Sequence, residues 1–262
     1  MALISCENLT VGYDGIKLLS DVNFQVQQGD YLSILGGNGS GKTTLVKLLM
    51  RLYDPTSGSV SVSGTDAKDC RLSGWRSMFG CVFQDCKVLA ATVRENVLLG
   101  EPITDGNEDE IVVEALKKSG AWEKISSFEK GIDTVLTREF DSKGENLSGG
   151  EAQKVALARI FARKRPVVIL DEPSSALDPI AEHQMFENMM AAAGDSTVLF
   201  ISHRLSTAVN ADRILMMEKG AIVESGTHEE LMAQNGKYAA MFRVQAANYN
   251  GGTTEGEEVA AQ

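Results

Sequence analysis

The stretch that decides the fold is "GGNGSGKT", Gly36 to Thr43, called the phosphate loop below. It fits the pattern G-x-x-x-x-G-K-[ST] between an apolar strand-like run and a helix-like run. Glycines let a backbone wrap closely round a phosphate chain, and the helix start adds partial positive charge. We therefore expect bound nucleoside triphosphate, with Lys42 on its β- and γ-phosphates and the Thr43 hydroxyl on Mg²⁺. The alternative, a flexible Gly/Ser turn, is disfavoured by the complete motif in its strand–loop–helix context.

The segments around this loop alternate between strand-like and helix-like patterns, which predicts an α/β fold with a largely parallel sheet. The runs "YLSIL" (31–35), "VVIL" (167–170) and "TVLFIS" (197–202) are nearly continuous apolar stretches, as expected of strands buried on both faces. The helix after the loop is expected to carry four leucines on one face, up to Leu52, and to stop at Pro55 and Gly58.

Two acidic residues, Asp171 and Glu172, follow the run "VVIL". Because parallel strands present their carboxyl ends to the ligand, this is where a metal-binding carboxylate is expected. Neighbouring residues at a strand end point in different directions. Asp171 is therefore expected to hold Mg²⁺ through its water shell and Glu172 to polarise the water that attacks the γ-phosphate. His203 directly follows "TVLFIS" and is expected to face the γ-phosphate.

Composition limits the classes of protein this chain can belong to. The chain has 262 residues, 43% of them hydrophobic, and a net charge of −11, which argues against the basic surface that nucleic acid requires. Its four cysteines show no metal-ligand spacing, so we expect reduced cysteines that pack in the interior. No apolar run approaches the roughly 18 residues that a membrane-spanning helix needs.

The region from about residue 85 to 165 is mostly helical in pattern, and we interpret it as a helical subdomain inserted into a nucleotide-binding domain that spans 1–249. Asn107 is expected to cap a helix whose first turn is acidic and whose last turn is basic. Thr227 and Glu230 have capping-box spacing. Residues 250–262 form a Gly-rich acidic tail and are expected to be disordered.

A second glycine turn, "LSGGE" (Leu147, Ser148, Gly149, Gly150 and Glu151), lies about twenty residues before "VVILDEP". One triphosphate needs one cradle, so the second turn is expected to contact a nucleotide held elsewhere. This turn resembles the signature sequence of ABC ATPases, and the resemblance covers roughly residues 3–245. It implies a P-loop NTPase (RecA-like) fold with an antiparallel N-terminal β subdomain. It also implies that two domains pack head to tail, so that each ATP lies between one phosphate loop and the other copy's signature turn.

The resemblance assigns further roles. Tyr13 looks like the aromatic residue that stacks on adenine. Gln84 resembles the glutamine that contacts Mg²⁺ and the attacking water and transmits the nucleotide state to the membrane partner. Asp178 ends a stretch that resembles the loop crossing between the two sites. His203 resembles the switch histidine. The implied ATP-binding set is Tyr13, Gly36, Gly37, Asn38, Gly39, Ser40, Gly41, Lys42, Thr43 and Thr44; the catalytic set is Glu172, His203, Gln84 and Lys42; the metal ligands are Thr43, Gln84 and Asp171. Two positions depart from the family pattern: Glu151 stands in place of glutamine, and Gly37 in place of a frequent proline.

Three functions remain open. From about Leu45 onward, stretches such as "TVRENVLLG" and "ESGTHEELMAQNGKYAAMF" resemble exporters, which predicts an ATP-hydrolysing domain that dimerises around two ATP–Mg²⁺ and drives export through a transmembrane partner. The N-terminal part resembles importer ATPase subunits, so a detached importer subunit is the alternative; the chain then reads as a mosaic, or as a domain excised or redesigned from a longer exporter. A third possibility is a soluble ABC protein that acts on ribosomes or DNA. The first two place the chain in the cytoplasm, on the inner face of the membrane. The transported substrate, and whether the pair is a homodimer or a heterodimer, are not encoded here.

Overall fold

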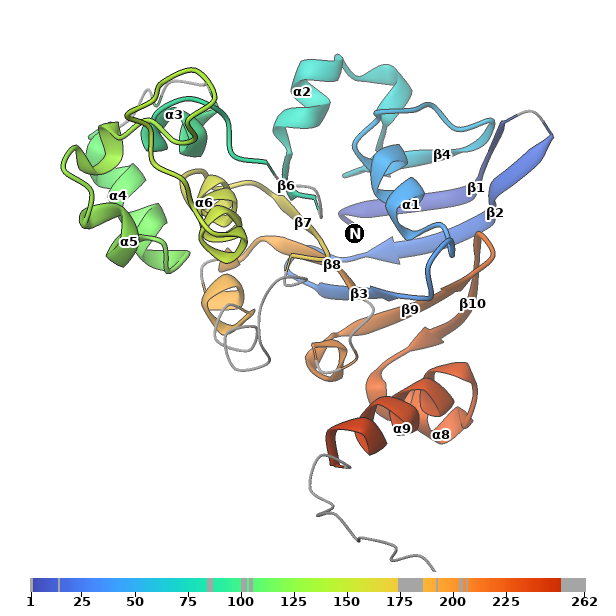
Figure 1. Ribbon diagram of the computed structural model, residues 1–262. Helices are drawn as coiled ribbons and strands as arrows, with labels where there is room; N and C mark the ends of the chain where they lie inside the picture. Colours follow the sequence, from blue (N-terminus) through green and yellow to red (C-terminus); the bar gives the residue numbers. More distant parts are fainter. Residues whose placement is uncertain are drawn as a thin grey trace, which may run out of the picture.

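The computed structural model describes residues 2–13, 15–83, 87–99, 103, 106–173, 186–191, 193–202, 205 and 207–250, with the backbone only for 248–250 (Figure 1). The acidic tail lies outside this range from residue 251 on. None of the helices in the described ranges combines the length and the apolar character needed to cross a bilayer.

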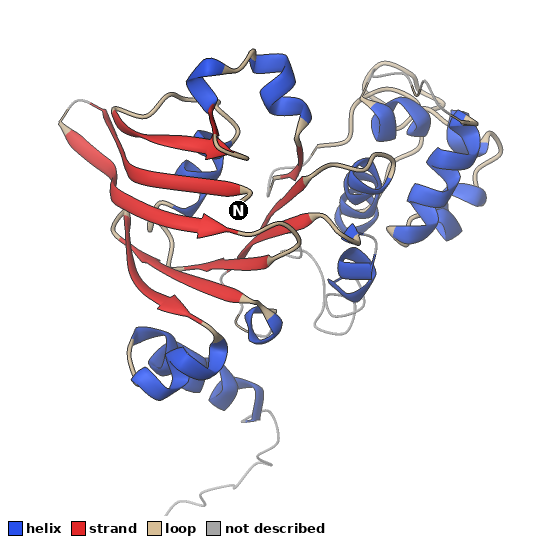
Figure 2. Ribbon diagram, turned by 180° about the vertical axis from the view of Figure 1, so that it is seen from behind, coloured by secondary structure: helices blue, strands red, loops and turns tan. Residues whose placement is uncertain are grey.

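Two sheets form the centre of the molecule (Figure 2). Within the described residues, one sheet has four strands in an antiparallel arrangement and the other has six strands, of which all but the edge strand β10 run parallel to their neighbours. The first has the order β2 (Ile16–Val26), β1 (Ile4–Tyr13), β4 (Ser57–Val62) and β5 (Thr65–Asp66). The second has the order β10 (Ala221–Gly226), β9 (Arg213–Glu218), β3 (Tyr31–Leu35), β8 (Thr197–Ser202), β7 (Val167–Asp171) and β6 (Phe79–Val82). The predicted α/β class and the three predicted apolar strands are confirmed.

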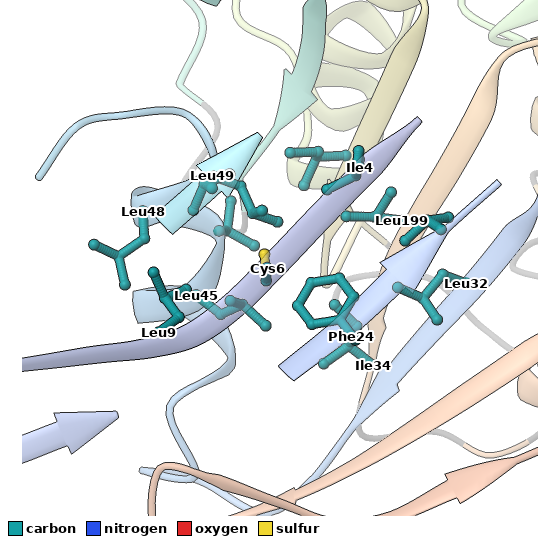
Figure 3. Packing of buried hydrophobic residues seen from close by; sticks show 14 of the residues in the cluster. Ile4, Cys6, Leu9, Phe24, Leu32, Ile34, Leu45, Leu48, Leu49 and Leu199 are labelled. Carbon is teal, nitrogen blue, oxygen red and sulfur yellow. The ribbon is translucent and has the colours of Figure 1, made fainter. Parts of the chain in front are cut away.

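The central strands β3, β7 and β8 are buried along their whole length, because side chains of both faces pack into a core. Leu32 and Ile34 face the four-stranded sheet and α1 (Lys42–Leu49), where they join Ile4, Phe24 and Leu45 (Figure 3). The alternate residues of the same strands pack on the other face against α6 (Gly149–Phe161), α8 (His228–Gln234) and α9 (Lys237–Asn250). The continuous apolar pattern therefore reflects a sheet between two layers.

A separate core holds the helical lobe beside the sheet (Figure 1). It is built from α3 (Val93–Leu98), α4 (Glu108–Lys118), α5 (Trp122–Ser126), the short turn η2 (Gly131–Asp133) and the side of α6 that faces them. Asn107 accepts a hydrogen bond from the Asp109 N–H at 3.1 Å, as its capping position predicts. The remaining short elements are η1 (Ala67–Asp69), α2 (Leu72–Ser77) and η3 (Ala208–Asn210).

One predicted boundary is wrong. Helix α1 ends at Leu49, well before Pro55, and Leu52 is 40% exposed rather than on the buried face. The reason is a Schellman-type stop: Arg51 adopts φ +52°, and the N–H groups of Arg51 and Leu52 donate back to the carbonyls of Leu48 and Lys47. The Arg51 guanidinium donates to the carbonyls of Ala67 and Cys70, which holds this turn in place.

Glu224 of β10 links the C-terminal helix α9 to the sheet through hydrogen bonds. Its two carboxylate oxygens accept hydrogen bonds from the N–H groups of Lys237 (2.6 Å) and Tyr238 (2.9 Å), so a strand residue caps the start of α9. At the same place, the Tyr238 hydroxyl lies 2.6 Å from Nδ1 of His228. The capping box predicted for Thr227 and Glu230 at the start of α8 is confirmed.

Replacing this cap should cost stability. We expect Glu224→Ala to lower the free energy of unfolding by about 1–2 kcal/mol, because a helix start loses its charged acceptor. Urea denaturation of the full chain measures the change. Glu129→Ala, which removes an exposed carboxylate from the helical lobe, is the control and should change the free energy by less than about 0.5 kcal/mol. An equal loss in both variants would contradict the capping role.

Candidate nucleotide-binding and signature sites

The phosphate loop connects β3 to α1 in the conformation that its glycines permit. Gly41 is the N-cap of α1 with φ +101°, and a Cβ there would lie 2.6 Å from the Leu19 side chain. Gly36 has φ +154°, and a Cβ would lie 2.4 Å from the carbonyl oxygen of Met217. Both positions therefore require glycine. Gly37 differs, because a Cβ there meets nothing within 4 Å, so the departure from proline at this position disturbs no packing.

No side chain caps the start of α1. The first N–H groups of a helix have no acceptor inside it, and they carry the positive end of its dipole. In the loop before them, Asn38 and Gly39 are exposed, whereas Ser40 is buried. In the helix itself, Thr43 is exposed and Thr44 is half-buried. The loop thus presents a row of backbone donors, open to solvent, to an anion such as a phosphate group.

Lys42 occupies the inside of this loop. Its side chain is buried, and Nζ donates to the carbonyls of Gly36 (2.6 Å) and Gly37 (3.1 Å). Burial lowers the pKa of Lys42, while the nearby charges of Glu172 and Asp171 act in the opposite direction. The ammonium group is therefore held by groups that a phosphate oxygen could replace as acceptors.

Asp171 and Glu172 lie at the carboxyl end of β7, where the sequence analysis placed them. Asp171 is only 2% exposed, and burial raises the pKa of its carboxyl group, although the hydrogen bond with Thr43 lowers it. Glu172 turns away from the strand direction with φ +50°, and its N–H donates to the carbonyl of Ile201 at 2.9 Å. Both carboxylates thus interact with the charge of Lys42, and the Asp171 carboxylate is hydrogen-bonded with Thr43.

The Asp171–Thr43 pair suits Mg²⁺. Both side chains offer hard oxygen donors, and a buried carboxylate favours a divalent counter-charge. In the described part of the chain, no group of three or more His, Cys, Asp or Glu side chains could hold a metal alone. A magnesium ion at this place would therefore take further oxygen ligands from the triphosphate, which is the usual mode for this ion.

Tyr13 ends strand β1 and is 73% exposed. It pairs with Ile16 on β2, and further along β2 the Leu19 side chain lies against Gly41 of the phosphate loop. The exposed Tyr13 ring thus belongs to the end of the β1–β2 hairpin, three residues along β2 from the residue that lies against the phosphate loop. Gln84, Asp178 and His203 lie outside the described residues, so their predicted roles remain predictions.

The signature turn, Leu147 to Glu151, starts α6. Ser148 is the N-cap; its hydroxyl accepts from the Glu151 N–H, while the Glu151 carboxylate accepts from the Ser148 N–H at 2.8 Å. These bonds form a capping box, which the spacing Ser-x-x-Glu signals and which the sequence analysis did not use at this turn. The N–H groups of Gly149 and Gly150, the first two helical residues, have no acceptor within the helix itself. Gly149 is exposed, and a Cβ there meets nothing within 4 Å, so no contact with the described residues accounts for its glycine.

Comparison with known proteins now identifies the family. Residues 19–175, which include the phosphate loop, the signature turn and both carboxylates, match the family model described as "ABC transporter". The chain belongs to the ABC transporter family. Its fold is the P-loop NTPase fold of these ATPases, with the antiparallel N-terminal sheet and the helices that the resemblance implied.

Several relatives of this ABC transporter chain are described as export proteins. The chain is 40% identical to "Putative multidrug export ATP-binding/permease protein YgaD" of Bacillus subtilis over 247 residues. This aligned region makes up 94% of the chain and 41% of the relative. A Staphylococcus aureus (strain NCTC 8325) protein with the same description is 40% identical over 228 residues, covering 87% of the chain and 38% of the relative. A bacterial Atm1-family ABC exporter solved with ATP bound has a TM-score of 0.84 and 34% identity, covering 93% of this chain and 42% of that one.

The chain thus spans about two fifths of the length of these relatives. The part it shares with them is of the exporter type, and the importer alternative is not favoured.

Proposed function

We propose that this chain is the ATP-binding and ATP-hydrolysing domain of an exporter, and that two such domains close around two ATP–Mg²⁺ to drive a transmembrane partner. The domain would comprise residues 1–249 with its helical subdomain at about 85–165. The observation that carries the proposal is the presence, on one chain, of two glycine-rich helix starts, at the phosphate loop and at Gly149. The helices α1 and α6 stand apart, with the strands of the main sheet between them (Figures 1 and 2). A single nucleotide is therefore not expected to touch both turns of one copy.

The proposed reaction depends on position and charge. Lys42 would transfer its donors from the loop carbonyls to the β- and γ-phosphates. Thr43, Asp171 and Gln84 would hold Mg²⁺, which when bound neutralises charge that develops on the phosphoryl oxygens. Glu172 would accept a proton from the attacking water, and His203 would contact the γ-phosphate. Tyr13 would stack on adenine, and the loop ending at Asp178 would link the two sites.

The transmembrane partner has a candidate docking surface. A groove of about 330 Å³ between α2, β6 and α3 is lined by residues that include Arg76, Phe79 and Leu99. Leu99, which lines this groove, is 53% exposed, and Leu72 at the start of α2 is 46% exposed. In the sequence, Gln84 follows β6 after one residue, Phe83. The relatives are described as ATP-binding/permease proteins, and the permease part would bind here, on the cytoplasmic face of the membrane. Exposed Phe140, between Glu139 and Asp141, would be a second contact.

Gly149 provides a sharp test of the pairing. Gly149→Val should leave the melting temperature unchanged, since the added side chain enters open space within the chain. It should lower ATP turnover at least about tenfold, because a branched side chain would meet the partner copy's nucleotide. Gly74→Val is the matched control, since a Cβ at Gly74 also meets nothing within 4 Å. Phosphate release and thermal melts measure both variants. Parent turnover in Gly149→Val would contradict the proposed function.

A further inference from the structure

The signature turn of this chain carries a negative charge at the place where the proposed function requires a phosphate to bind. The Glu151 carboxylate lies in the first turn of α6, fixed by its hydrogen bond from the Ser148 N–H at 2.8 Å. Ser148 and Gly149 beside it are exposed. An anion at a helix start stabilises the helix, and it also cancels part of the positive potential that a bound phosphate would use. The capping box therefore favours the fold and opposes the proposed ligand.

A second charge compensates for the first. Lys124 of α5 places Nζ 3.7 Å from Oε1 of Glu151, while Oε2 is the oxygen that accepts from Ser148. The same ammonium lies 5.4 Å from the ring centroid of Phe128. Hydrogen bonding with Ser148 and the charge of Lys124 both lower the pKa of Glu151, so the carboxylate is ionised at neutral pH.

The pair contributes little to stability by itself. The side chains of Lys124 and Glu151 are 43% and 31% exposed, and exposed ion pairs contribute only marginally to folding. A cavity of about 390 Å³ lies at the same place, lined by residues of α5 and α6 that include Lys124, Glu151 and Lys154. The ion pair thus borders open space beside the turn and is not part of a packed core. An effect of Lys124 on nucleotide-driven pairing is therefore separable from an effect on folding.

We propose that Lys124 is a positioning and charge-neutralising residue of the signature turn, which allows a turn that ends in Glu151 to receive the triphosphate held by the partner copy. The inference rests on the proposed function, because it requires that nucleotide in trans. Lys124 acts through Glu151 and does not touch the nucleotide. Glutamine at position 151 would keep the capping box and would need no counter-charge.

The test is a double-mutant cycle in the Glu172→Gln background. Analytical ultracentrifugation measures the extent of ATP-driven dimerisation at low and at high salt. At saturating ATP, Lys124→Gln should raise the dimer dissociation constant by about threefold for each site, or about tenfold for a dimer with two sites. The defect should shrink as salt rises, since an exposed charge is screened.

Lys124→Gln combined with Glu151→Gln should restore dimerisation, and Lys124→Arg should retain it. Lys117→Gln removes an exposed ion pair with Glu114 in the same lobe and should have no effect.

The outcomes separate this inference from the proposed function. If the Glu172→Gln background forms no dimer with ATP, the proposed function itself fails. If it dimerises and Lys124→Gln dimerises equally well, only the role of Lys124 is overturned. If Lys124→Gln is defective and Glu151→Gln does not rescue it, Lys124 acts through the structure of the lobe and the neutralising role is wrong.

Discussion

Glu172→Gln is expected to reduce ATP turnover by about 10²- to 10⁴-fold, the usual contribution of a general base. Glutamine has the same shape and tolerates the same backbone turn, but it cannot accept a proton from the attacking water. ATP affinity should therefore remain near the parent value, and the ATP-bound state should accumulate. Single-turnover phosphate release and equilibrium ATP binding measure the two quantities separately.

The control for this variant is Glu129→Gln, which makes the same change at an exposed position in the helical lobe and should hydrolyse ATP at the parent rate. Hydrolysis at the parent rate by Glu172→Gln would show that another group activates the water. Loss of ATP binding in Glu172→Gln would show that the carboxylate positions the nucleotide instead.

Lys42→Ala is expected to weaken ATP binding by about 10- to 100-fold, the range for losing charged hydrogen bonds to an anion. The structure places this ammonium inside the phosphate loop, where it donates to Gly36 and Gly37. Removing it leaves the β- and γ-phosphates with backbone donors alone. Calorimetric titration with ATP in the presence of Mg²⁺ measures the change in affinity.

Lys42 also holds the phosphate loop through its bonds to Gly36 and Gly37, so its folding role must be separated from its binding role. A thermal melt without nucleotide reports the first, and Lys68→Ala, which removes an exposed lysine from η1, is the control for both. Unchanged ATP affinity in Lys42→Ala would contradict the role of the loop. A variant that binds poorly only because it is unfolded would be recognised by its melt.

Local patterns predicted most of the fold. The buried strands β3, β7 and β8 were evident as apolar runs, and the loop after β3 was evident from its glycine spacing, because both depend on residues close together in the chain. The end of α1 was misplaced, since its stop depends on Arg51 in a left-handed conformation, which side-chain type alone does not reveal. The Arg51 contacts to Ala67 and Cys70 join segments that no periodicity relates.

The cluster of residues around the phosphate loop was predictable from the sequence, but the ion pair at the signature turn was not. The structure brings Lys42, Thr43, Asp171 and Glu172 together, as the strand-end argument required. The resemblance marked Glu151 only as a position that departs from the family pattern, where glutamine is usual. Its capping box was available from the spacing to Ser148, but the ion pair with Lys124 was not, because it depends on how α5 packs against α6. Roles that depend on a second copy remain predictions, because one chain contains only half of each proposed site.

The most direct test of the proposed pairing of two copies mixes two differently tagged populations of the Glu172→Gln protein. In both populations the native cysteines have been replaced. One carries Asn38→Cys in the phosphate loop and the other Ser148→Cys in the signature turn; both positions are exposed. The account predicts that a short bifunctional thiol reagent links the two tags when ATP and Mg²⁺ are present and not when they are absent. Abundant ATP binding without any mixed-tag product would contradict it.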